Sequence, residues 1–191
     1  MEGRELADYL IRTNVPNFAL DRLQQAYEFL RTNSEHLEDT STVISDPAAY
    51  LTALGDDTDA DGANTWRIVD VNEGARFWSV VAVHSMKFLA VVGEYQEMLV
   101  ACADKNCLAT AMWFVRSSSL ELQCQAISLI RSLLAHKKLA YQFVEEGGIE
   151  LFLDQSRKDR AALTHTAVAY SIYRLACFPG VMELMLSLNA A

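Results

Sequence analysis

The chain has 191 residues, 51% of them hydrophobic, which is enough for one domain with a sizeable core. Its net charge of −9 and its lack of any basic run longer than two residues exclude nucleic acid as the expected partner. With only three prolines and so many apolar residues, the chain is expected to fold rather than stay disordered.

The first 70 residues are expected to form divergent helices. An amphipathic stretch over residues 5–12 is expected to end at Asn14–Pro16, because the residue before a proline avoids the helical conformation. Asn17 or Asp21 can then cap a helix that runs to about Arg31. We expect this N-terminal part to form a unit of its own, separate from residues 71–191.

Acidic residues are concentrated in the N-terminal part of the chain. Residues 1–75 hold 15 acidic and 5 basic side chains, whereas residues 76–191 hold 10 and 11. Solvated helix faces and loops are the simplest explanation of this asymmetry. An acidic surface that attracts a basic partner is the alternative.

The segment 55–64 contains half of a calcium-binding loop. Asp57, Asp59 and Asp61 occupy the first three ligand positions of an EF-hand loop, and a glycine follows at the position of the sharp turn. The closing glutamate is missing, because Ile68 stands in its place. We therefore expect an acidic loop, with weak calcium binding as the alternative.

A long apolar helix is expected from Glu73 to Val92, followed by a break at Gly93. His84 in the middle of this helix is expected to lie in the core or in a groove. His84 and Lys87 also interrupt the apolar run, so no membrane-spanning segment is expected. Further helices are expected over residues 94–102, 108–115, 161–178 and 181–188.

The segment 120–153 has the pattern of one helical repeat. Two amphipathic helices, with a turn and cap expected before them at Ser117–Ser119, are followed by Gly147 and Gly148, and Ile149 begins a third helix. A glycine just past a helix end is expected to take the left-handed conformation. This order of helices around Gly-Gly-Ile is typical of armadillo proteins. Such units cannot bury their apolar faces alone, so they stack and bind other proteins on the resulting surfaces.

No segment shows a convincing strand pattern, so the sequence predicts an all-α fold. We expect an armadillo/HEAT-like helical-repeat solenoid, with divergent helices and the acidic loop in residues 1–70 and repeats in residues 71–191. The last helix is apolar and has no polar cap, so self-association is an expected property.

No pattern of catalytic or metal-binding residues stands out. The four cysteines form no CxxC pair and read as thiols of a reducing compartment, the nucleus or the cytoplasm. The histidines lack the spacing of a zinc site, and no phosphate-binding, dinucleotide-binding or nucleophile motif occurs. We therefore expect no metal, no cofactor and no enzymatic activity.

Aromatic residues at helical spacing are expected mainly in the core, with a role in partner binding as the alternative. The residues concerned are Trp113, Phe114, Tyr141, Phe143, Tyr170 and Tyr173.

Three blocks resemble the armadillo-like region of the Vpr-binding protein family in their order and separation. They are Gly93–Leu99 (GEYQEML), Leu133–Ala140 (LLAHKKLA) and Phe143–Ile149 (FVEEGGI). The segment Tyr170–Met185 is similar to the next helix pair of that region. The repeat signature is carried by Gly93, Tyr95, His136, Gly147, Gly148 and Ile149.

Members of that family are substrate receptors of a cullin-RING ubiquitin ligase, and the resemblance covers about residues 80–191. It implies a non-enzymatic scaffold that recruits substrates for ubiquitylation, with ligase subunits or substrates as its partners. Full-length members are large and carry a WD40 propeller, whose blade periodicity is not found here, so the chain looks like a fragment or a truncated homologue. A generic armadillo adaptor and, less favoured, a calcium-regulated interaction module are the alternatives.

Overall fold

The computed structural model describes residues 9, 12–33, 71–117, 119–157 and 162–188, and within these ranges it contains helices and no strand. The all-α prediction is confirmed for this part of the chain. The helices are α2 (Val15–Thr32), α4 (Val71–Val92), α5 (Met98–Asp104), α6 (Cys107–Val115), α7 (Leu120–Leu133), α8 (Lys137–Glu145), α9 (Gly148–Arg157), α10 (Ala162–Ala176) and α11 (Pro179–Leu188).

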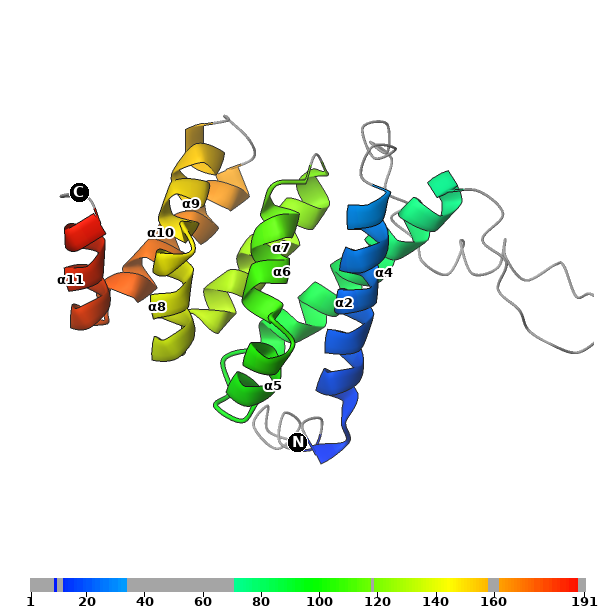
Figure 1. Ribbon diagram of the computed structural model, residues 1–191, viewed down its shortest axis with the longest axis horizontal. Coiled ribbons are helices and arrows are strands. Elements are labelled where there is room, and N and C mark those ends of the chain that lie inside the picture. The colour runs from blue at the N-terminus through cyan, green and yellow to red at the C-terminus, as the bar shows by residue number, and fades with distance from the viewer. Residues whose placement is uncertain (1–8, 10–11, 34–70, 118, 158–161, 189–191) are drawn as a thin grey trace, which may run out of the picture.

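The helices form two layers (Figure 1). α4, α7 and α10 run obliquely behind α2, α6, α8 and α11, and neighbouring helices of the rear layer pack against one another. α9 packs against α8 and α10, and α5 leads into α6. This arrangement of layers brings residues of distant sequence together. The regular repeat of an armadillo or HEAT solenoid and the unit boundary at residue 70 stay predictions.

Helix α7 lies at the centre of the fold and contacts α4, α6 and α10. Ser119 caps its N-terminus, where the side-chain oxygen accepts a hydrogen bond from the Leu122 amide at 3.5 Å, and Arg131 lies in its last turn. Each fully buried Leu or Ile contributes about 1.5–3 kcal/mol of hydrophobic stabilisation. The buried apolar residues of α7 are Leu122, Ala126, Ile127, Leu129, Ile130 and Leu133.

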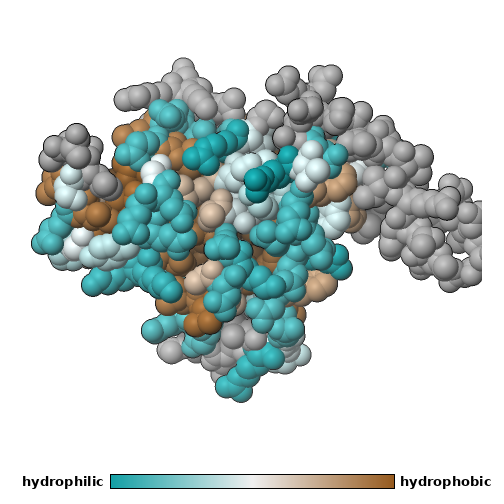
Figure 2. All heavy atoms as spheres, viewed as in Figure 1, coloured by the Kyte–Doolittle hydropathy of each residue, from teal (hydrophilic) through white to brown (hydrophobic). Residues whose placement is uncertain are grey.

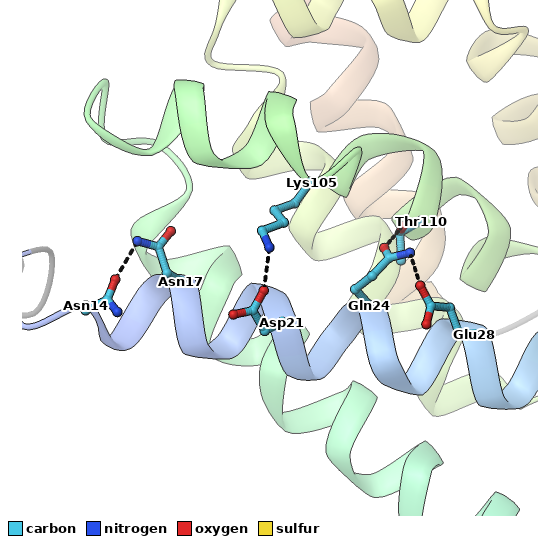
Figure 3. A network of polar contacts seen from close by, with 7 residues as sticks. All are labelled: Asn14, Asn17, Asp21, Gln24, Glu28, Lys105 and Thr110. Atoms are coloured by element: carbon cyan, nitrogen blue, oxygen red, sulfur yellow. Dashed lines mark hydrogen bonds and ion pairs between the residues drawn. The ribbon is translucent and has the colours of Figure 1, made fainter.

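Helix α2 begins earlier than the sequence pattern predicts. Arg12 is helical and Thr13 and Asn14 form a turn before α2, so the predicted break at Asn14–Pro16 is confirmed. Pro16 itself lies in the first turn of α2, where the missing N–H of proline costs no helical hydrogen bond. Asn14 adopts the left-handed conformation (φ 61°), and its side chain accepts a hydrogen bond from Asn17 at 2.6 Å (Figure 3). The predicted caps, Asn17 and Asp21, are therefore helical residues.

Polar contacts attach α2 to α5 and α6 along its length. Asp21 forms an ion pair with Lys105 at 2.7 Å, and Gln24 accepts a hydrogen bond from Thr110 at 3.3 Å (Figure 3). Tyr27 meets the ring of Trp113 edge-on, with centroids 5.3 Å apart. Leu20, Leu23, Ala26 and Leu30 of α2 enter the same hydrophobic core as the later helices.

Helix α4 spans 22 residues, and its stretch Glu73–Val92 is apolar and long enough to cross a membrane. A bent pair, α5 with α6, passes the same test only when taken as one span. Core helices of soluble proteins satisfy these criteria too. α4 packs between α2 and α7 and buries Met86 and Leu89 there, as a core helix does. His84 is exposed, so its predicted burial is wrong.

Two glycines at the junction of α8 and α9 have different roles. Gly147 has a φ of 76°, the left-handed conformation that was predicted for a residue at a helix end. Gly148 is the first residue of α9, and a Cβ there would collide with the ring of Phe143. That ring packs against Phe152 with centroids 4.9 Å apart. The junction therefore needs glycine once for conformation and once for space.

A similar close approach occurs at the start of α11. Pro179 and Gly180 lie in its first turn, so this helix begins two residues before the predicted start at residue 181. A Cβ on Gly180 would collide with the hydroxyl of Tyr141 on α8. The absence of a side chain at Gly180 is what allows α11 to pack against α8.

Replacing the two glycines of the α8–α9 junction separates these roles. We expect Gly148→Ala to lower the free energy of unfolding by about 1–3 kcal/mol, because Phe143 must move. Gly147→Ala is expected to lower the free energy of unfolding by about 1–2 kcal/mol, because alanine is strained in the left-handed conformation. Gly147→Asn should lower it less, because asparagine tolerates that conformation. Urea unfolding of the three variants measures this. A Gly148→Ala variant as stable as the parent would contradict the packing argument.

Candidate interaction surface

The calcium-loop candidates Asp57, Asp59 and Asp61 lie outside the described residues, so that hypothesis stays a prediction. Within the described ranges, no group of three or more His, Cys, Asp or Glu side chains is placed to hold a metal ion. The repeat signature and the exposed aromatic residues are therefore the candidate functional residues of the described part of the chain.

Gly93 and His136, 43 positions apart, meet in the structure. Nε2 of His136 lies 2.7 Å from the carbonyl oxygen of Gly93, and the imidazole is buried. Because the carbonyl can only accept, Nε2 carries the proton and donates it. His136 is also the residue that precedes the first turn of α8. The contact therefore fixes the end of α4 to the α7–α8 junction.

Gly93 has no room for a side chain at this contact. A Cβ there would lie 2.7 Å from Oγ of Ser132 and 2.8 Å from the carbonyl oxygen of Leu89. The Ser132 hydroxyl is buried and has no hydrogen-bond partner among the described residues. Glycine is thus required at position 93 by close approach.

The other signature residues also have structural roles. Tyr95 lies in the turn between α4 and α5, where its carbonyl oxygen accepts a hydrogen bond from the Met98 amide at 3.0 Å. Tyr95 and Ile149 are partly buried against the core. The six residues thus form two groups, one around Gly93 and one around Gly147. Both groups set the angle between successive helices and leave no reactive group exposed.

The aromatic residues divide between core and surface. Phe114 and Phe143 are fully buried, and Trp113 and Tyr141 are partly buried against the core, as the core interpretation predicts. Tyr170 and Tyr173 on α10 are 42% and 64% exposed. These two tyrosines are the aromatic candidates that a partner could contact.

The two exposed tyrosines form a cluster with two arginines, which we call the tyrosine–arginine cluster: Tyr170, Tyr173, Arg131 and Arg174. The ring centroids of the tyrosines are 6.1 Å apart. The guanidinium carbons of Arg131 and Arg174 lie 5.5 Å and 5.3 Å from the Tyr170 centroid, within the range of cation–π attraction. The cluster therefore presents aromatic and guanidinium groups together, the side chains most enriched at binding hot spots.

The two arginines differ in their partners. Arg174 donates to Glu94 at 2.8 Å and to the hydroxyl of Tyr170 at 3.4 Å. Desolvation opposes its charge, but these hydrogen bonds outweigh it and raise the pKa of Arg174. Arg131 has no carboxylate partner in the described part of the chain. One guanidinium is thus held by the protein and the other is open to a ligand.

Sequence reasoning identified the tyrosines but missed the arginines and Glu94. The spacing of Tyr170 and Arg174 by four residues indicates a contact along one helix face. No comparable signal connects Arg131 or Glu94 with α10. Those contacts depend on how α7 and the α4–α5 turn pack, which the sequence pattern does not specify.

Two cysteines form a separate pair inside the fold. The thiols of Cys102 and Cys107 are buried and hydrogen-bonded to each other. This hydrogen bond and burial together raise the pKa of Cys107 well above its usual value, so this thiol stays protonated. Cys124 is partly exposed and Cys177 is exposed, and all four are free thiols. The buried pair packs the α5–α6 turn and has no access to a substrate.

Removing the His136 imidazole tests the contact between α4 and the α7–α8 junction. His136→Ala leaves the Gly93 carbonyl oxygen buried without a donor, so the free energy of unfolding should fall by about 1–3 kcal/mol. The matched control is His84→Ala, an exposed position, which should change stability by less than about 0.5 kcal/mol. Equal effects in thermal unfolding would refute a structural role for His136.

Removing the unpaired hydroxyl of Ser132 is expected to stabilise the protein, in contrast to the loss of the His136 imidazole. Ser132→Ala removes a desolvated polar group and should raise the free energy of unfolding by about 1 kcal/mol. Ser128→Ala on the same helix controls for the better helix propensity of alanine, because Ser128 is partly exposed. If Ser132→Ala destabilises the protein while Ser128→Ala does not, the hydroxyl has a partner.

Comparison with known proteins places most of this chain in one family. A family model described as the Mahjong helical domain matches residues 79–189. The chain is 34% identical over 107 residues to Protein mahjong of Drosophila melanogaster, a match that covers 54% of this chain and 7% of that protein. It is 29% identical over 107 residues to the DDB1- and CUL4-associated factor homolog 1 of Caenorhabditis elegans, covering 54% and 6%.

The matched segment is less than a tenth of the length of these relatives. No solved structure matches the chain. The matched residues begin inside α4 and end in the tail after α11, so they contain the Gly93–His136 contact, the α8–α9 junction and the tyrosine–arginine cluster. Since the family model covers more than half of the chain, this protein belongs to the Mahjong helical domain family.

Proposed function

We propose that this chain is a non-enzymatic interaction scaffold that recruits substrates to a cullin-RING ubiquitin ligase. The observation that carries the proposal is its membership of the Mahjong helical domain family, with a relative whose name describes a DDB1- and CUL4-associated factor. The resemblance to the Vpr-binding protein family covers nearly the same residues, about 80–191 against 79–189. Both lines of reasoning lead to a substrate receptor.

The geometry supports recruitment rather than chemistry. The signature residues are used to fix helix angles, and the exposed cluster on α10 consists of groups that bind partners. A scaffold accelerates ubiquitylation by holding a substrate near the enzyme, so its contribution is effective concentration. No reactive residue is needed for this mechanism.

This role carries further proposals about partners and location. Ligase subunits or substrates are the proposed partners, and the nucleus and cytoplasm are the proposed compartments. A generic armadillo-type adaptor is the competing function, and the two differ in whether ligase subunits accompany the protein.

Affinity purification of the tagged protein from its own cells tests the proposal. We expect DDB1 and cullin 4 to co-purify with the intact protein and with a form that lacks residues 79–189. A subset of other proteins should disappear on the deletion, because those proteins are recruited by the helices. Mass spectrometry identifies both groups.

The control is a form that carries Arg22→Gln on α2, outside the matched residues, which should retain all partners. If neither DDB1 nor cullin 4 accompanies any form, the ligase assignment is wrong and the chain is an adaptor of another kind. If they accompany all forms but deletion changes no other partner, the helices do not recruit.

A further inference from the structure

The rear layer of helices carries a charge opposite to that of the chain. α4, α7 and α10 together hold four basic residues and two acidic ones, although the chain has a net charge of −9. Two of the four basic residues are in ion pairs, Lys87 with Glu121 at 3.4 Å and Arg174 with Glu94 at 2.8 Å. The remaining helices hold seven acidic and five basic residues. Figure 2 shows the opposite layer, where hydrophilic residues cover much of α2 and α8.

Within this positive layer, Arg131 is held in position without an anion. Its guanidinium lies 5.5 Å from the Tyr170 centroid and has no carboxylate partner among the described residues. α10 contains no acidic residue, and the only acid of α7 is the paired Glu121. A guanidinium that is partly desolvated, held against a ring and left unpaired is preorganised for a carboxylate, which it binds through two parallel hydrogen bonds.

The surroundings of Arg131 add an apolar component. Tyr173 is 64% exposed and its ring lies 6.1 Å from the Tyr170 ring that Arg131 contacts, so it adds exposed ring surface to the cluster. Glu94 pairs with Arg174 at 2.8 Å, and Arg174 donates to the hydroxyl of Tyr170 at 3.4 Å, which helps to hold that ring in place. A ligand that fits must therefore supply a carboxylate and an apolar group close together.

We propose that the tyrosine–arginine cluster on α7 and α10 binds an acidic peptide segment of a partner protein, with Arg131 receiving a carboxylate and Tyr173 an adjacent apolar side chain. This inference specifies the chemistry of the partner that the scaffold proposed above would recruit, and to that extent it rests on the proposed function. Charge complementarity with the positive layer selects the partner, and the net negative charge of the chain repels acidic segments from other surfaces.

Fluorescence anisotropy of the full chain tests this with a defined probe. The probe is a labelled peptide of alternating glutamate and leucine pairs, compared with the same peptide in which glutamine replaces glutamate. We expect the glutamate peptide to bind, and Arg131→Gln to weaken its binding about tenfold, the effect of a lost charge-assisted hydrogen bond. Tyr173→Ala should also weaken binding of the glutamate peptide. The unaltered protein should bind the glutamine peptide as weakly as the Arg131→Gln variant binds the glutamate peptide.

The matched control is Arg22→Gln, which removes an arginine held over Phe18 at 4.8 Å on the other layer. This variant should bind the glutamate peptide as the parent does. A second readout on the unaltered chain follows the Arg131 side-chain Nε–H resonance, which should shift as the peptide is added. No binding by the parent, equal binding by Arg131→Gln, or an equal loss in Arg22→Gln would each overturn the proposal.

The two proposals fail separately. If DDB1 and cullin 4 co-purify and recruitment depends on residues 79–189 while the glutamate peptide does not bind, the acidic-partner proposal is wrong and the scaffold stands. If the peptide binds as expected but no ligase subunit co-purifies, the surface stands and the ligase assignment is wrong.

Discussion

The width of the apolar stripe on α7 is the constraint on which the rest of the structure depends. Its buried residues face α4, α6 and α10, so no single neighbouring helix could cover them. A helix with this pattern is stable only inside a stack. The two layers of Figure 1 follow from it, because α4 and α10 flank α7 in one layer and α6 covers it from the other.

Stacked helices need fixed angles between them, and the residues that resemble the Vpr-binding proteins supply these angles. Gly93 belongs to the first block and His136 to the second, and the hydrogen bond between them joins α4 to the α7–α8 junction. Glu94, in the first block, reaches Arg174 on α10. The blocks are therefore parts of one set of contacts, and the same contacts hold the tyrosine–arginine cluster at the surface.

Local pattern predicted the helices well where capping and periodicity agreed. The Ser119 cap, the left-handed Gly147 and the long apolar α4 were all predicted, since each depends on neighbouring residues only. The start of α2 was predicted too late, at Asn17 or Asp21, because Pro16 can occupy the first turn of a helix. His84 was misread because a helix apolar over half its circumference still has an exposed side.

Candidate site residues were harder to predict because they meet only through packing. The roles of Gly93 and His136 depend on a contact between residues 43 positions apart in the sequence, and Arg131 on α7 faces Tyr170 on the neighbouring helix α10. The surface that we propose as functional is therefore a property of the stack. It could be suspected from exposed aromatic residues but not located from the sequence.

Hydrogen exchange tests the central claim, that partners bind the layer formed by α4, α7 and α10. The protein is compared alone and in the assembly purified with DDB1, and exchange is followed for each helix by mass spectrometry. We expect slower exchange in the assembly over α10 and the end of α7 around Arg131, with α2 and α6 unchanged. Protection confined to α2, α6, α8 and α11 would contradict it.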